Sequence, residues 1–284
     1  DRVYFVDGDL GDYISLQNAV DESKPDYVFH LAAQSYPRVG FTSPLATLDT
    51  NILGTERLLD VLRRYRGIDP VIHVCSSSEV FGRVPKEYLP INESCSFHPA
   101  SPYAISKAGA DLVGRFHAEA YGQKVVVTRM FTHTGPRRGD VFAESTFSKQ
   151  IAMIEQGMIP PVIKTGNLDS LRTWSDVRDA VRAYYLLVTT NPIPGEYYNI
   201  GGTFSCTIGD MLHHLLSLSH RANIKIETEQ SRIRPLDADL QVPDTGKFRQ
   251  HTGWEPIIPF EKTMQDLLDY WRDKVKTGKV FLTR

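Results

Sequence analysis

Short apolar runs closed by polar or small residues recur along the first half of the chain. They cover residues 3–6, 27–31, 71–75 and 124–128. A continuous apolar run of this length bounded by turn residues is typical of a strand that is buried on both faces. We therefore expect four buried strands in this half of the molecule.

Stretches with apolar residues at helical spacing separate these runs. They cover residues 14–22, 47–65 and 103–121, and within the second stretch Leu48 and Ile52 are four residues apart. The alternation of strand and helix predicts an α/β fold with a doubly wound parallel sheet that has helices on both faces.

The pattern changes after about residue 132, where Pro and Gly cluster and interrupt the alternation. A helix is then expected over residues 175–189 and a strand over 197–200. Further helices are expected near residues 207–219 and 259–274. The second half therefore combines a return to the sheet with a smaller lobe.

Composition places the chain among ordinary globular proteins. Apolar residues make up 41% and charged residues 23%, and the formal net charge is -2. This balance is not that of a disordered chain and gives no sign of nucleic-acid binding. No apolar run approaches the ~20 residues that span a bilayer, so no membrane association is predicted.

The cysteines and histidines show no metal-ligand spacing. Cys75, Cys95 and Cys206 lie far apart and form no CxxC pair. Neither a metal site nor a disulfide framework is therefore predicted, and a reducing cytoplasm is the expected location.

Tyr103 and Lys107 lie four residues apart in a predicted helix, on the same face. A Lys cation beside a phenol favours the phenolate, so it would lower the Tyr pKa from its ordinary value of about 10 and make the Tyr a usable base. Taken alone, this spacing more often reflects a packed ring and a solvated amine.

A run of hydroxyls, residues 76–78, follows directly after the predicted strand 71–75. In open α/β sheets ligands bind at the carboxyl ends of the strands. A Ser-rich turn explains the run equally well when it is seen alone. Ser77, however, precedes Tyr103 by 26 residues, and Ser77, Tyr103 and Lys107 together match the triad of the short-chain dehydrogenases.

Further segments extend this match from residue 3 to about 272. The chain resembles the extended short-chain dehydrogenases/reductases of the NAD-dependent epimerase/dehydratase family, and it is most similar to the GDP-mannose 4,6-dehydratases. The most specific signals are residues 33–35, 77–79, 101–104, 136–139, 166–169 and 234–235. Asn51 to Thr55 carry a pattern that the extended members of the superfamily share.

The resemblance implies a domain arrangement. The fold would be Rossmann-like with a smaller α+β substrate lobe. The GxxGxxG phosphate loop of such enzymes is absent, so we expect roughly 30 to 50 further residues upstream, about one βαβ unit. The predicted parts are a dinucleotide-binding domain shortened at its N-terminus (1–132), a substrate lobe (133–170), a return to the Rossmann-like sheet (171–200) and the rest of the substrate lobe (201–284).

The resemblance also implies an enzyme that acts on a nucleotide-diphosphate sugar, with GDP-mannose favoured. The cofactor would be NADP or NAD, with NADP favoured, and the assembly a homodimer or homotetramer. The implied catalytic residues are Ser77, Glu79, Tyr103 and Lys107. The implied cofactor contacts are Asp9, Leu10, Leu31, Ala32, Ala33, Gln34, Ser35, Tyr103, Lys107, His133 and Arg138. The implied substrate contacts are Thr132, Arg172 and Arg234.

Glu79 bears most on the type of reaction. The dehydratases of the family resemble this chain in having Glu at this place, whereas plain epimerases tend to have a small residue. One carboxyl group can serve as base for the C5 proton and as acid for the C6 hydroxyl of a hexose. The sequence therefore predicts a nucleotide-sugar 4,6-dehydratase, a lyase.

Other functions are also compatible with the sequence. A GDP-4-keto-6-deoxy-sugar reductase is the near alternative, because the C-terminal half resembles such reductases equally well, and a nucleotide-sugar epimerase is another. A non-catalytic binding protein is the remote one. Two residues depart from the dehydratase pattern: Thr132 replaces a substrate-binding Asn, and Ala46 replaces a Tyr that contacts the cofactor.

Overall fold

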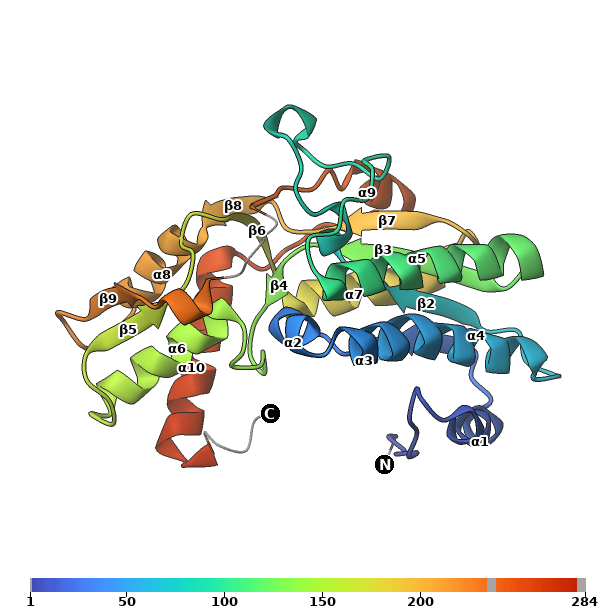
Figure 1. The fold of residues 1–284 in the computed structure, drawn as a ribbon, viewed down its shortest axis with the longest axis horizontal. Helices are drawn as coiled ribbons and strands as arrows, with labels where there is room; N and C mark the ends of the chain where they lie inside the picture. Colours follow the sequence, from blue (N-terminus) through green and yellow to red (C-terminus); the bar gives the residue numbers. More distant parts are fainter. Residues whose placement is uncertain (1, 234–238, 280–284) are drawn as a thin grey trace.

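The computed structural model of the protein describes residues 2–233 and 239–279, which form a mixed α/β fold (Figure 1). Four parallel strands, β1 (Tyr27–His30), β2 (Val71–Cys75), β3 (Lys124–Met130) and β7 (Tyr197–Ile200), pair in that order. Helices pack on both faces of this sheet through separate apolar clusters. α1 (Tyr13–Ser23), α4 (Gly54–Arg64) and α5 (Pro102–Tyr121) lie on one face and α7 (Val177–Thr189) on the other. The predicted doubly wound parallel sheet is thereby confirmed.

The remaining elements follow in chain order. They are α1 (Tyr13–Ser23), α2 (Pro37–Thr42), α3 (Pro44–Leu48), the π-helix η1 (Asp49–Leu53), α4 (Gly54–Arg64), the short 3-10 helices η2 (Ser78–Phe81) and η3 (Lys86–Tyr88), α5 (Pro102–Tyr121), β4 (His133–Thr134), α6 (Ala143–Glu155), β5 (Val162–Thr165), β6 (Leu171–Asp176), α7 (Val177–Thr189), β8 (Phe204–Thr207), α8 (Ile208–Ser217), β9 (Lys225–Thr228), the 3-10 helix η4 (Gln230–Arg232), β10 (Leu240–Gln241), α9 (Gly246–Thr252) and α10 (Phe260–Lys276).

The strand predicted over residues 3–6 is wrong. These residues have no regular structure and are exposed, Phe5 to 94%. They pair with no strand in the described part of the chain, and an unpaired apolar run has no partner for its backbone groups. The fourth strand of the parallel sheet is β7 instead. β1 is an edge strand whose Tyr27 and Phe29 side chains are exposed rather than buried.

A smaller lobe lies beside the sheet, where α6, α8 and α10 surround an apolar core (Figure 1). β6 is its central strand and pairs with β4, β8 and β10, while β5 pairs with β9. The helix expected from residue 175 begins at Val177, because β6 continues to Asp176 and the Asp176 side chain caps the helix by accepting from the Arg178 N–H. How the chain divides into domains stays a prediction. No helix in the described part is both long and apolar enough to cross a membrane.

A buried ion pair joins the sheet to α5. Arg129 in β3 is 2% exposed, and its Nε and Nη2 donate to the two carboxylate oxygens of Asp111 at 2.8 and 3.1 Å. A third donor, Nη1, lies 3.0 Å from the Glu93 carbonyl oxygen. The ring of Tyr197 lies 4.2 Å from the guanidinium carbon. The cation is therefore fully enclosed.

Removing Asp111 should be strongly destabilising. Asp111→Ala leaves the Arg129 charge buried and uncompensated, so we expect the free energy of unfolding to fall by about 3 to 5 kcal/mol. Urea denaturation followed by circular dichroism measures this loss. Asp69→Ala is the control, because it breaks an exposed pair with Lys124 and should cost less than about 1 kcal/mol. Equal losses in the two variants would contradict the prediction.

One face of α5 exposes large apolar side chains that the described part of the chain does not cover. Ile105, Leu112 and Phe116 are each about half-exposed. We predict that this face pairs with a second copy of the chain across a two-fold axis. Light scattering at micromolar concentration should give a homodimer or larger, and Leu112→Glu should shift it towards monomer. Ile257→Glu, at an exposed apolar residue of the loop before α10, should not. A monomeric wild type would count against the prediction.

Candidate active site

A cavity of about 740 Å³ opens at the carboxyl ends of β1, β2 and β3, between the parallel sheet and the smaller lobe. This size is within the usual range for small-molecule sites. The residues implied by the sequence that line it are Leu31, Ala33, Ser35, Ser77, Glu79, Tyr103, Lys107, Thr132, His133, Arg138 and Arg172. Segments more than 100 residues apart in the chain thus meet at one place.

The other implied residues lie elsewhere. Ala32 and Gln34 alternate with the lining residues of the segment after β1 but do not line the cavity. Asp9 and Leu10 lie outside the lining of this cavity, and a Cβ on Gly54 would come within 2.8 Å of the Leu10 Cβ. Arg234 is outside the described residues.

Ser77 and Glu79 are held by a tight turn after β2. Ser77 caps η2, because its Oγ accepts the Glu79 N–H at 3.2 Å. The turn ends at Gly82, which has φ +57° and lies so close to the His98 carbonyl that a Cβ would be 1.7 Å from its oxygen. The buried Phe81 ring anchors η2 in an apolar cluster. The backbone that carries Ser77 and Glu79 is therefore fixed on both sides.

The start of α5 places Tyr103 and Lys107. The Ser101 Oγ accepts the Ala104 N–H at 3.0 Å and caps the helix. Lys107, one turn after Tyr103, donates from its Nζ to the Cys75 carbonyl oxygen at 2.8 Å. In return the Ser76 Oγ donates to the Lys107 carbonyl oxygen at 3.1 Å. These two bonds lock the end of β2 to α5.

The pKa of Tyr103 is raised, not lowered as the sequence led us to expect. Burial is the largest cause, and the neighbouring Cys75 and Glu79 raise it further. Hydrogen bonding by Ser77 and the charge of Arg138 act in the opposite direction but do not outweigh burial. Burial also lowers the pKa of Lys107. Burial therefore favours the protonated phenol near neutrality.

An amide in η1 connects the segment after β1 to α5. The Asn51 side chain accepts from the Gln34 N–H at 2.8 Å and donates to the Gln34 carbonyl oxygen at 2.9 Å. It also donates to the Ser106 Oγ at 2.8 Å, and Ser106 in turn donates to the Tyr103 carbonyl oxygen at 2.7 Å. The Gln34 side-chain amide donates to Thr47, which explains why this residue turns away from the cavity.

Positive charge faces the cavity from the smaller lobe. Arg172 in β6 is 8% exposed. The Arg138 guanidinium stacks 3.4 Å from the centre of the Phe142 ring and donates to Glu144 at 3.2 Å. Burial lowers the pKa of His133 to about 4, and Arg138 adds to that shift. His133 is therefore neutral, and the Arg side chains are the groups suited to phosphate oxygens.

Several lining residues were missed by sequence reasoning. Tyr184 is buried, its hydroxyl lies 3.7 Å from the Cys75 Sγ, and burial raises its pKa. Arg38 and Glu144 also line the cavity. Tyr184 falls on the apolar face of a predicted helix. The helical periodicity of the apolar residues therefore indicates that Tyr184 is buried, but not that it lies near a site. Glu144 had no local signal, because six residues separate it from its partner Arg138 and only the folded chain brings the two together.

The cavity can accommodate a nicotinamide cofactor. The segment after β1 contributes the small residues Ala33 and Ser35 to the lining, which leaves its backbone accessible to a cofactor. Tyr103 and Lys107 lie in the same cavity. Together with Glu79 they provide two acid–base groups and a cation, which suits proton transfer at a hydroxyl and at a neighbouring carbon. Within the described ranges no cluster of His, Cys, Asp or Glu is suited to a metal ion.

Comparison with known proteins gives the same picture over most of the chain. Residues 1–267 match the family model described as GDP-mannose 4,6 dehydratase. The chain is 31% identical to the GDP-6-deoxy-D-mannose reductase of Pseudomonas aeruginosa over 89% of this chain and 82% of the relative. It is 32% identical to GDP-mannose 4,6 dehydratase 1 of Arabidopsis thaliana over 96% and 75%. The solved structure of RMD from Pseudomonas aeruginosa complexed with NADPH has a TM-score of 0.88 and 30% identity, and the match covers 95% of this chain and 90% of that one.

Proposed function

Because the chain belongs to the GDP-mannose 4,6 dehydratase family, we propose that it converts GDP-mannose to GDP-4-keto-6-deoxymannose. The family uses NAD or NADP, and in this reaction the cofactor ends each turnover as it began. The observation that carries the proposal is the presence of Glu79 beside Ser77 and Tyr103 in one cavity. A carboxylic acid at this place gives the site a second acid–base group besides the tyrosine.

Tyr103 and Ser77 act at C4 of the sugar. Tyr103 takes the proton of the C4 hydroxyl, and Ser77 holds the C4 oxygen by a hydrogen bond. The nicotinamide supplies reversible hydride transfer. Arg138 adds positive charge near the phenol, and Tyr103 would lose its proton more readily with a positively charged, oxidised nicotinamide bound beside it. Proton loss from Tyr103 is thereby linked to cofactor binding.

Glu79 acts one carbon further along the sugar. Oxidation at C4 gives a ketone, which acidifies the hydrogen on C5. The Glu79 carboxylate takes this proton and then gives a proton to the C6 hydroxyl, which leaves as water. With the cofactor bound, the hydride taken from C4 would return to C6, and the proton that Tyr103 took from the C4 hydroxyl would balance the proton added at C5, so the product would be a 4-keto-6-deoxy sugar. The short helix η2, which Ser77 caps, holds the Glu79 backbone and supports this role.

The binding roles rest on charge and, for the described residues, on their location in the cavity. Arg172, with Arg234, would hold the diphosphate of the sugar nucleotide, and Thr132 would contact the sugar. The segment after β1, His133 and Arg138 would hold the dinucleotide, for which NADP is favoured. Contacts from Asp9 and Leu10 stay predictions.

A reductase is the second candidate, and the similarity to the Pseudomonas aeruginosa reductase favours it. One assay separates the two. The protein is incubated with GDP-mannose and NADP, and the product is identified by mass and by reduction with borohydride. A 4-keto product without net change of cofactor supports the dehydratase. Absence of product, together with stoichiometric oxidation of NADPH by a GDP-4-keto-6-deoxy sugar, would replace it with the reductase.

A further inference from the structure

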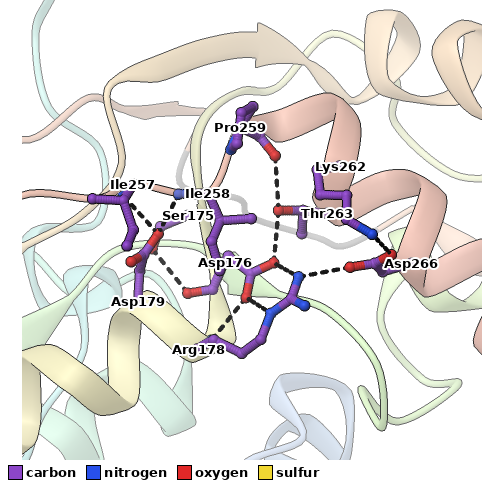
Figure 2. Close-up of polar contacts among 10 residues, drawn as sticks. All are labelled: Ser175, Asp176, Arg178, Asp179, Ile257, Ile258, Pro259, Lys262, Thr263 and Asp266. Carbon is purple, nitrogen blue, oxygen red and sulfur yellow. Dashed lines mark hydrogen bonds and ion pairs between the residues drawn. The ribbon is translucent and has the colours of Figure 1, made fainter.

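A buried carboxylate ends β6. Asp176 is the last residue of that strand and is 1% exposed. Its Oδ1 accepts the backbone N–H and the Nε of Arg178, both at 2.8 Å. Its Oδ2 accepts the Arg178 Nη2 at 2.7 Å and the Thr263 hydroxyl at 2.8 Å (Figure 2). Both oxygens are therefore fully used by two residues.

These bonds attach α10 to the start of α7. Thr263 and Asp266 are three residues apart on α10 and face the same way. Arg178 donates to Asp266 at 2.8 Å as well as to Asp176, so it bridges the two carboxylates (Figure 2). The Arg178 side chain is 47% exposed, and such a partly solvated pair contributes little to stability. The buried Thr263–Asp176 hydrogen bond is therefore the stronger of the two links between α10 and the start of α7.

Three segments that line the cavity meet at Asp176. β6 carries Arg172 into the lining. In β4, His133 pairs with Ser175 and Thr134 pairs with Asp176. The residue after Asp176, Val177, lines the cavity and packs against Gly135, where a Cβ would come within 2.9 Å of the Val177 Cγ1. A shift of Asp176 therefore moves parts of three walls together.

The carboxylate is kept charged. Burial alone would raise the pKa of Asp176, but the hydrogen bonds from Arg178 and Thr263 outweigh it and hold the pKa below its ordinary value. A buried charge with all its partners in place adds little net stability to the fold. Its role is then to fix the geometry of the groups around it. One turn later, Asp179 provides a contrast, because it accepts from the backbone N–H groups of Ile257 and Ile258 and does not line the cavity (Figure 2).

We propose that Asp176 is a positioning residue: with Thr263 and Arg178 it fixes β6, β4 and the start of α7 against α10, so that the cavity keeps the shape that binds the nucleotide sugar. The inference rests on the proposed function for its substrate. Asp176 acts through the cavity-lining residues on either side of it. It makes no contact of its own with the reacting atoms.

The test uses Thr263→Val, which keeps the shape of the side chain and removes only the buried hydroxyl. We expect KM for GDP-mannose to rise about tenfold with kcat changed less than about threefold, because Tyr103 and Glu79 lie on elements that Asp176 does not hold; tenfold corresponds to about one hydrogen bond. Thr263→Ser should restore KM. Asp176→Asn is the second variant and should raise KM further. Arg182→Gln is the matched control, since Arg182 pairs with Asp179 on the same helix, and should leave KM unchanged.

Hydrogen exchange on the ligand-free protein gives a readout independent of activity. Amides of β4 and β6 should exchange about tenfold faster in Thr263→Val than in wild type, and at the wild-type rate in Arg182→Gln. A lower melting temperature with unchanged KM and unchanged exchange would overturn the inference, since the network would then only stabilise the fold. If wild type turns over no GDP-mannose, the proposed function fails, and exchange alone decides: equal rates in the Thr263→Val variant and wild type would reject the positioning role.

Discussion

The Tyr103→Phe variant is expected to lose turnover by a factor of about 10³ to 10⁴, the upper part of the range for removing a general acid–base group. Only the hydroxyl is removed, and the ring continues to fill its place in the first turn of α5. Affinity for the nucleotide sugar should stay within about threefold, because the hydroxyl is needed for proton transfer more than for binding. Steady-state kinetics and binding calorimetry measure the two quantities separately.

The matched control is Tyr65→Phe, which removes a hydroxyl that pairs with Asp21 at the surface and should leave turnover unchanged. If the Tyr103→Phe variant keeps activity within a few-fold of wild type, Tyr103 is not the base. In that event the second phenol of the cavity, Tyr184, becomes the candidate to test.

Local sequence was enough to predict most of the sheet and the central pair of the site. The strands β2 and β3 follow from apolar runs, and Ser101 followed by Pro102 marks the helix start that places Tyr103. The run at residues 3–6 is also apolar but forms no strand. Composition reports the tendency to be buried, whereas a strand also needs a neighbour that supplies hydrogen bonds.

The electrostatics of the site could not be predicted from spacing. The i, i+4 relation of Tyr103 to Lys107 suggested a lowered phenol pKa, yet burial and the approach of Cys75 and Glu79 raise it. Those neighbours come from the end of β2 and from η2, and their distances depend on how strand and helix pack. The same holds for Tyr184, which helical periodicity places on a buried face without indicating that the face ends at a cavity.

The role proposed for Asp176 could not be predicted from local sequence either. The sequence places it within the first turn of a predicted helix, where an Asp is a common capping residue. Its bonds to Thr263 and, through Arg178, to Asp266 join residues nearly 90 positions apart. Tertiary pairing of this kind leaves no local pattern, so only the folded chain shows that the cap also connects two parts of the molecule.

Glu79→Gln separates the dehydratase from the reductase. The amide keeps the size and shape of the side chain but cannot take the C5 proton. Oxidation at C4 by Tyr103 and the cofactor can still occur, so elimination stalls after the first step. Turnover should fall ~100-fold or more, the loss expected when a general acid–base group is removed. Reduced nicotinamide should accumulate on the enzyme, visible as near-ultraviolet absorbance that wild type does not build up under the same conditions.

Glu144→Gln is the control for this experiment, because Glu144 is a second carboxylate in the same cavity with no part in the proposed proton transfer. It should trap no reduced cofactor. In a reductase the C5 proton is never removed, so Glu79→Gln would cost far less there. Near-normal turnover of Glu79→Gln with GDP-mannose, and no trapped reduced cofactor, would therefore exclude Glu79 as the C5 base and remove the observation on which the dehydratase proposal depends.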